Sequence, residues 1–96
     1  MQNAISLNTL NFQLSETHQA EVTDKFRRVL GGAGAFIRLR VTLEGKYPSN
    51  TAVYYNARAV METRSQELYI TTRSEFLYNA IDELVAKIGA TLARSS

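Results

Sequence analysis

The side chains whose types and spacing point to chemistry in this sequence are lysines and arginines. Lys25 and Arg28 are three residues apart, so on a helix they share one face, with Arg27 beside them. Lys87 and Arg94 are seven residues apart and fall on one side of a second predicted helix. If the two helices pack side by side, these five cations form one basic surface of the kind that binds phosphate groups. Spacing alone somewhat favours the plainer interpretation, in which they belong to solvated helix faces.

A second basic patch falls in the middle of the sequence, on predicted strands. Its members are Arg38, Arg40, Arg58 and Tyr54. The tyrosine would add an aromatic surface for stacking bases, as in RNA-binding proteins that use a sheet. Cross-strand ion pairs with Glu44 and Glu67 explain the arginines more simply, and we favour that explanation.

No arrangement of residues typical of catalysis accompanies these cations. The chain has no cysteine, which excludes disulfides and thiolate chemistry. His18 is the single histidine, and its spacing of four and eight residues from Val22 and Phe26 predicts a partly buried packing side chain rather than a metal ligand. Asp82 and Glu83 would point about 100° apart on a helix, so they form no facing carboxylate pair. We therefore expect no enzyme activity and no metal site.

The composition is that of one globular domain, which we expect to span residues 1–96. Hydrophobic residues make up 45% of the chain and charged residues 21%, and the net charge of +2 does not by itself indicate nucleic-acid binding. The N-terminus lacks the pattern of a secretory signal, and no apolar stretch approaches the ~20 residues that a membrane helix needs. These features predict a cytoplasmic protein without a membrane partner.

Local patterns predict one strand and one helix in the first third of the chain. Residues 4–14 indicate a strand broken near residues 8–9, with apolar side chains at every second position from Leu10 to Leu14. Ser15 is the expected N-cap of a helix that reaches about Leu30. Gly31 and Gly32 follow, and we expect a left-handed glycine to end the helix there.

Three more strands and a second helix follow. Residues 37–44, 51–61 and 67–72 show strand patterns, and the short links between them favour an antiparallel meander. Ser74 is the expected cap of the last helix, whose apolar stripe consists of Leu77, Ala80, Ile81, Leu84, Ile88 and Leu92. The order β-α-β-β-β-α predicts an α+β fold, a four-stranded sheet with two helices packed on one face.

The last third of the chain resembles a known family. The segments Glu67–Thr72 and Leu77–Ile88 resemble the strand and the "MYAAIDLLVDKL" helix of ribosome hibernation-promoting factors, also called ribosome-associated inhibitor or sigma-54 modulation proteins. Val22–Phe26 resembles their "V-x-x-K-F/L" segment, and the order of elements agrees. The resemblance is to the short form of the family and covers nearly the whole chain. It is specific in the final helix and loose between Gly31 and Gln66.

This resemblance implies a non-catalytic factor without a cofactor. Such a factor would occupy the decoding region of the small ribosomal subunit through rRNA phosphate contacts and inhibit translation under stress. It implies that Lys25, Arg28, Lys87 and Arg94 contact RNA, with Arg27 assisting, because these positions match basic positions of the family. The basic surface predicted from spacing is therefore the one that the resemblance implies.

Two departures from the family pattern keep an alternative open. Ala90 stands where the family usually has arginine, and Phe76 stands where it usually has an acidic residue. The alternative is a diverged protein–protein interaction module with the same fold and little ribosome affinity. Such a module would use aromatic side chains such as Tyr54, Tyr55 and Phe76. An edge strand could also join two copies of the chain into a homo-oligomer.

Overall fold

The order of elements in the computed structural model confirms the predicted β-α-β-β-β-α arrangement. The structure describes residues 4–31, 38–50 and 52–95. The elements are β1 (Ala4–Leu10), α1 (Glu16–Leu30), β2 (Arg38–Lys46), β3 (Tyr54–Glu62), β4 (Glu67–Ser74) and α2 (Leu77–Ser95). Within these residues, no helix combines the length and the apolar character that crossing a bilayer requires.

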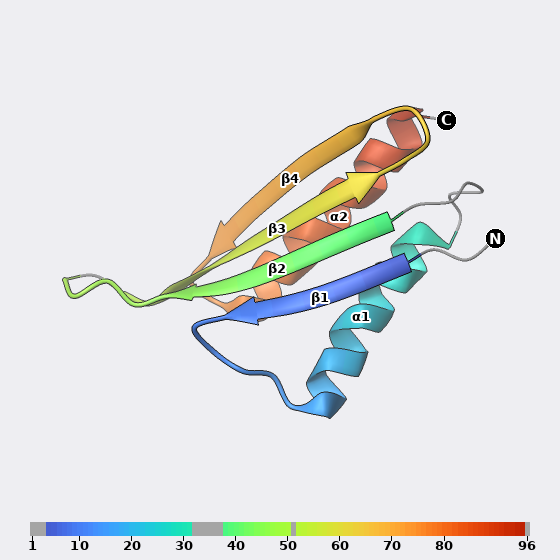
Figure 1. Cartoon of the computed structure of the whole chain (residues 1–96). Coiled ribbons are helices and arrows are strands. Elements are labelled where there is room, and N and C mark those ends of the chain that lie inside the picture. The colour runs from blue at the N-terminus through green and yellow to red at the C-terminus, as the bar shows by residue number, and fades with distance from the viewer. Residues whose placement is uncertain (1–3, 32–37, 51, 96) are drawn as a thin grey trace.

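The four strands form one mixed sheet in chain order, β1-β2-β3-β4. β1 runs parallel to β2, because α1 carries the chain back between them, and the later pairs form the predicted antiparallel meander. Both helices lie on the same face of the sheet, behind it in the view of Figure 1. α1 packs against β1 and α2, and α2 packs against β3 and β4. None of the described elements covers the opposite face of the sheet, the open face.

One-sided packing explains the alternation along β2. Leu39, Val41 and Leu43 are fully buried, whereas Arg38 and Arg40 point to the open face and are exposed. Each apolar side chain of this size contributes about 1.5–3 kcal/mol when it is buried. The helices supply the other half of the core through Val22, Phe26, Leu30, Ala80, Ile81, Leu84 and Ile88. The predicted stripe of α2 is confirmed, with Leu77 and Leu92 partly buried at its ends.

The predicted N-terminal cap of α1 is confirmed, and its predicted C-terminal cap is not. The Ser15 hydroxyl accepts a hydrogen bond from the His18 backbone N–H at 3.2 Å, which confirms the N-cap. At the other end, Gly31 has a right-handed conformation with φ −57°, and its N–H donates to the Arg28 carbonyl. The expected left-handed cap at Gly31 is therefore wrong, and Gly32 lies outside the described residues. A last turn closed by this backbone bond needs no positive φ.

β1 ends earlier than predicted, and the break expected near residues 8–9 is wrong, because the pairing with β2 continues through both residues. Asn11 adopts φ 66° immediately after the strand, a left-handed conformation that asparagine tolerates better than most residues. Its side-chain amide donates to the Gly45 carbonyl at 3.2 Å, which ties this turn to the end of β2. Leu10 is consequently left on the open face, 44% exposed, while Phe12 and Leu14 pack against the core from the following segment.

The later strands also extend differently from their predicted bounds. β2 continues to Lys46, β3 begins at Tyr54 and includes Glu62, and β4 continues to Ser74. The predicted first residues of the second and third strands, 37 and 51, lie outside the described part of the chain. Ser74 is thus a strand residue whose hydroxyl accepts from the Phe76 N–H at 3.2 Å, in the turn before α2 rather than as its cap.

A buried hydroxyl on β4 links the sheet to α2. Thr72 is nearly fully buried, and its hydroxyl donates to the Ala80 carbonyl at 2.7 Å. We expect Thr72→Val, which keeps the shape but removes the donor, to lower the free energy of unfolding by about 0.5–1.5 kcal/mol. Thr71→Val is the matched control, since Thr71 is exposed on the other face. Urea denaturation of both variants checks this, and equal losses would contradict it.

Candidate nucleic-acid interface

A shallow groove between α1 and α2 holds the first pair of predicted site residues. Its volume is about 380 Å³, and it is lined by Lys25, Arg28, Val29, Asp82 and Val85. The Lys25 ammonium lies 2.8 Å from a carboxylate oxygen of Asp82 and 5.9 Å from the centroid of the Tyr78 ring. The structure therefore brings Lys25 and Arg28 together, and it adds an acidic partner from the opposite helix.

The burial of α1 decides which way this pair points. Phe26 and Leu30 are buried in the core. Lys25 and Arg28 lie outside this buried face, on the side of α1 that faces the groove. The helices can approach closely at Gly89, where an added Cβ would lie 3.3 Å from a methyl group of Val29. The floor of the groove is therefore apolar, and its rim is charged.

The cations at the end of α1 pair within their own helix. Arg28 lies 2.5 Å and Arg27 3.8 Å from the carboxylate of Asp24. Both arginines are in the last turn, where positive charge also complements the helix dipole. Exposed ion pairs of this kind contribute about 0–1 kcal/mol. They restrain the arginines weakly, so an incoming anion can replace the carboxylate.

The other two predicted cations lie on a different side of α2. Lys87 turns toward β4, where its ammonium donates to the Thr71 carbonyl at 3.3 Å. Arg94 is exposed about two turns further along that side. Lys87 is five positions after the groove residue Asp82, which places it about 140° around the helix. The expected single surface is therefore divided by α2. The role of all five cations in binding RNA stays a prediction.

On the open face, Arg38 and Arg40 belong to a network of ion pairs. The Glu62 carboxylate lies 3.9 Å from Arg38 and 3.0 Å from Arg40, and Glu67 lies 3.9 Å from Arg40. Cross-strand pairing is thus confirmed for these two arginines, but Glu62 is the main partner. The other acid proposed from the sequence, Glu44, pairs instead with Lys46 at 3.2 Å.

The same network affects one tyrosine on β4. The Tyr69 hydroxyl donates to the Glu67 carboxylate, and this hydrogen bond together with the negative charge of Glu67 raises the pKa of Tyr69 above its usual 10.0. Tyr69 therefore stays neutral throughout the physiological range, as a hydrogen-bond donor rather than an acid.

His18 departs from its expected position. Its side chain is exposed, and its ring meets the Tyr78 ring edge to face with the centroids 6.4 Å apart. The expected partial burial is wrong because the buried stripe of α1 begins one turn later, at Val22. Among the residues that the structure describes, no three histidine, cysteine or acidic side chains gather in a way that could hold a metal ion.

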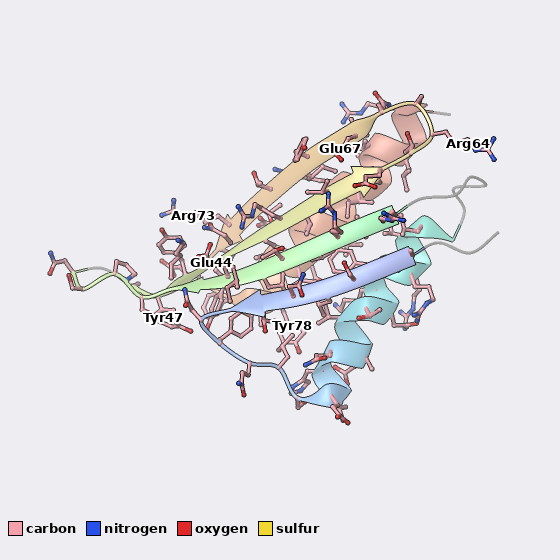
Figure 2. The ribbon with its side chains drawn as sticks, viewed as in Figure 1. Glu44, Tyr47, Arg64, Glu67, Arg73 and Tyr78 are labelled. Atoms are coloured by element: carbon pink, nitrogen blue, oxygen red, sulfur yellow. The ribbon has the colours of Figure 1, made fainter. Side chains whose placement is uncertain are left out.

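Arg73 is a cation that the sequence analysis missed. Its guanidinium lies 3.9 Å from the centroid of the Tyr54 ring, a cation–π contact. Figure 2 shows Arg73 at the same end of the sheet as Glu44 and at the opposite end from Arg64. The sequence did contain a signal, because Tyr69 and Arg73 are four residues apart and therefore lie on the same face of a strand. Arg73 was missed because the predicted strand ended at residue 72.

Comparison with known proteins identifies the fold. No family model matches the sequence, and no curated protein matches it significantly. The N-terminal domain of Protein Y from Thermus thermophilus is similar in structure, with a TM-score of 0.79 at 16% sequence identity over 97% of this chain and 99% of that chain. A ribosomal subunit interface protein from Coxiella burnetii has a TM-score of 0.77 at 14% identity over 98% of this chain and 97% of its own. At these identities, the likeness shows a shared fold.

The contact between Lys25 and Asp82 is the direct ionic link between the two helices in the groove. We expect a double-mutant cycle with Lys25→Met and Asp82→Asn to give a coupling energy of about 0.2–1 kcal/mol at low salt. The coupling should shrink in about 1 M salt, because exposed charges are screened there. Urea denaturation at both salt concentrations measures it. A coupling that is unchanged by salt would show that the two side chains interact by something other than charge.

Proposed function

We propose that this protein is a ribosome-binding factor that works without catalysis. It occupies the decoding region of the small ribosomal subunit through rRNA phosphate contacts and inhibits translation under stress. The observation that carries the proposal is the likeness of fold over almost the entire length of both chains, in one case to a protein named for the ribosomal subunit interface. Its place of action would be the cytoplasm, and it would need no cofactor.

The groove between the helices supports phosphate contacts of this kind. Lys25 and Arg28 stand on its rim, and Arg27 lies beside them at the end of α1. Their carboxylate partners are themselves exposed, so each cation can exchange a weak ion pair for a charge-assisted bond to a phosphate oxygen. The groove would thus follow an RNA backbone by charge and leave the bases unread.

Lys87 and Arg94 would supply a second row of contacts across α2. The exposed surface between the two rows carries the short side chains of Ala86 and Ala90, which follow the exposed carboxylate of Glu83 along the helix. A phosphate backbone can therefore come close to the helix there and reach cations on both sides. With Ala90 in place of a larger basic residue, this surface makes fewer phosphate contacts, so we expect weaker binding at physiological salt and a shallower dependence of affinity on salt.

A second candidate function is favoured by one specific observation, an exposed apolar region at one end of the molecule. β1, β2 and β4 all end there, since β4 runs in the same direction as β2. Leu10, Tyr47 and Phe76, which follow or end these strands, are 44%, 54% and 66% exposed. A protein partner, or a second copy of the chain, could cover such a region. This candidate predicts a binding partner other than RNA.

Co-sedimentation with small ribosomal subunits at about 50 mM and about 200 mM salt tests the first proposal. We expect saturable binding that falls with salt. Lys25→Gln/Arg28→Gln removes two cations without placing new acids beside Asp82 and Asp24. It should weaken binding at least tenfold and make the slope of log affinity against log salt shallower by about 1.4–1.8, or about 0.7–0.9 for each lost phosphate contact.

The control variant is Lys46→Gln/Arg64→Gln, which makes the same change in charge at sites remote from the groove. It should bind within about twofold of the original protein. Equal weakening by both variants would mean that overall charge, rather than the groove, holds the protein on the subunit. Absence of binding at the lower salt concentration would contradict the ribosome proposal and favour the protein-interaction module.

A further inference from the structure

The cations of this protein divide into two groups by their partners. Six of the eleven lysines and arginines lie within 4.0 Å of a carboxylate, as described above for α1, β2 and the groove. The other five have no carboxylate partner of this kind among the described residues: Arg58, Arg64, Arg73, Lys87 and Arg94. Three of these five, Arg58, Arg73 and Lys87, line a single cleft.

This cleft wraps around β4, the edge strand beside α2. It has a volume of about 530 Å³ and is lined by Glu44, Asn56, Arg58, Thr71, Thr72, Arg73, Glu83 and Lys87. Strand pairing places Arg58 opposite Thr71 and Asn56 opposite Arg73, so these four residues are neighbours on the open face. Lys87 and Glu83 reach the cleft from α2, on the other side of the edge strand.

The donors in the cleft suit an anion with several oxygens. The cleft contains two guanidinium groups and one ammonium, and the hydroxyl of Thr71 and the amide of Asn56 add further hydrogen-bond donors. Arg73 is restrained by its contact with the Tyr54 ring, which leaves the edges of the guanidinium available for hydrogen bonds. The Lys87 ammonium donates one N–H to the Thr71 carbonyl, and its other two N–H groups can donate to a ligand.

The charge of the cleft matches a phosphomonoester. Of its two carboxylates, Glu44 is neutralised by Lys46 at 3.2 Å, and Glu83 has no cation within 4.0 Å among the described residues. Three cations and one uncompensated carboxylate leave a charge of about +2, against about −1.5 to −2 for a phosphomonoester at neutral pH. A carboxylate ligand would bring only one charge and two oxygens.

We propose that this cleft is a binding site for a phosphomonoester, carried by a free nucleotide or by the terminal phosphate of an RNA strand. The cleft volume lies within the usual range of small-molecule sites, so there is room beside the phosphate for the rest of a nucleotide. Of the residues proposed to contact the ribosome, this site uses only Lys87. It therefore stands or falls independently of the groove between the helices.

The test is a titration of the ¹⁵N-labelled protein, followed by amide chemical shifts, at constant ionic strength. The four probes are inorganic phosphate, adenosine monophosphate, and a short RNA with either a 5′-phosphate or a 5′-hydroxyl. We expect saturable shifts at residues 56, 58, 71 and 73 with the phosphate-bearing probes. Binding of adenosine monophosphate identifies a free nucleotide as sufficient, whereas binding of the 5′-phosphorylated RNA alone identifies the end of a strand.

Two single variants make the same change in charge at different places. Arg58→Glu should weaken binding at least tenfold, because it removes a charge-assisted hydrogen bond and places a carboxylate beside the phosphate. Arg64→Glu alters an exposed arginine at the far end of the sheet and should change binding less than twofold (Figure 2). Lys25→Gln/Arg28→Gln should leave these shifts intact even if it abolishes ribosome binding. Absence of saturable shifts, equal binding of the 5′-hydroxyl RNA, or equal weakening by Arg58→Glu and Arg64→Glu would overturn the proposed site.

Discussion

Both helices pack on the same face of the sheet, so every strand has one buried side and one side in water. This constraint fixes the register of β2, where Leu39, Val41 and Leu43 alternate with arginines. A slip of one residue would carry Arg38 and Arg40 into the core, where an unpaired charge costs several kcal/mol. The same register sets the rows of residues across the open face. The positions of the surface charges are thus a consequence of how the core is packed.

The charges so placed are not equally available to a ligand. On α1 and on β2, each cation already has a carboxylate partner, although these exposed pairs are individually weak. Around β4, Arg58 and Arg73 have neighbours that donate hydrogen bonds or offer an aromatic face. Among the described residues, an anion approaching Arg58 and Arg73 meets no ion-pair partner within 4.0 Å, whereas one approaching the groove must displace Asp82 from Lys25 and Asp24 from Arg28. The ion pairs therefore contribute little to stability. Their main effect is to make the cations that lack a carboxylate partner the easier ones for a polyanion to contact.

The sequence predicts this fold well because both of its signals are local. Alternation identifies the strands, and the stripe of α2 identifies its buried face, so the order of elements and the side covered by the helices follow. The strand ends escaped prediction because they depend on contacts between distant residues, such as the Asn11 amide with the Gly45 carbonyl. The candidate site was predictable within one helix, as for Lys25 and Arg28. It was not predictable between helices, since the apolar stripe of α2 does not tell which flank faces α1 and which faces β4.

Lys87 shows how one side chain can serve the fold and a ligand together. Its ammonium covers the Thr71 carbonyl on the outer strand of the sheet, a position where free backbone groups invite another strand to pair. A positive charge at this edge also disfavours a second copy of the chain, which would bring the same charge to the same place. Self-association through a strand is therefore disfavoured at β4 relative to β1. The Lys87 ammonium that protects the edge of β4 is also partly solvated and lines the same cleft as Arg73. The same lysine can therefore protect the edge and attract an anion.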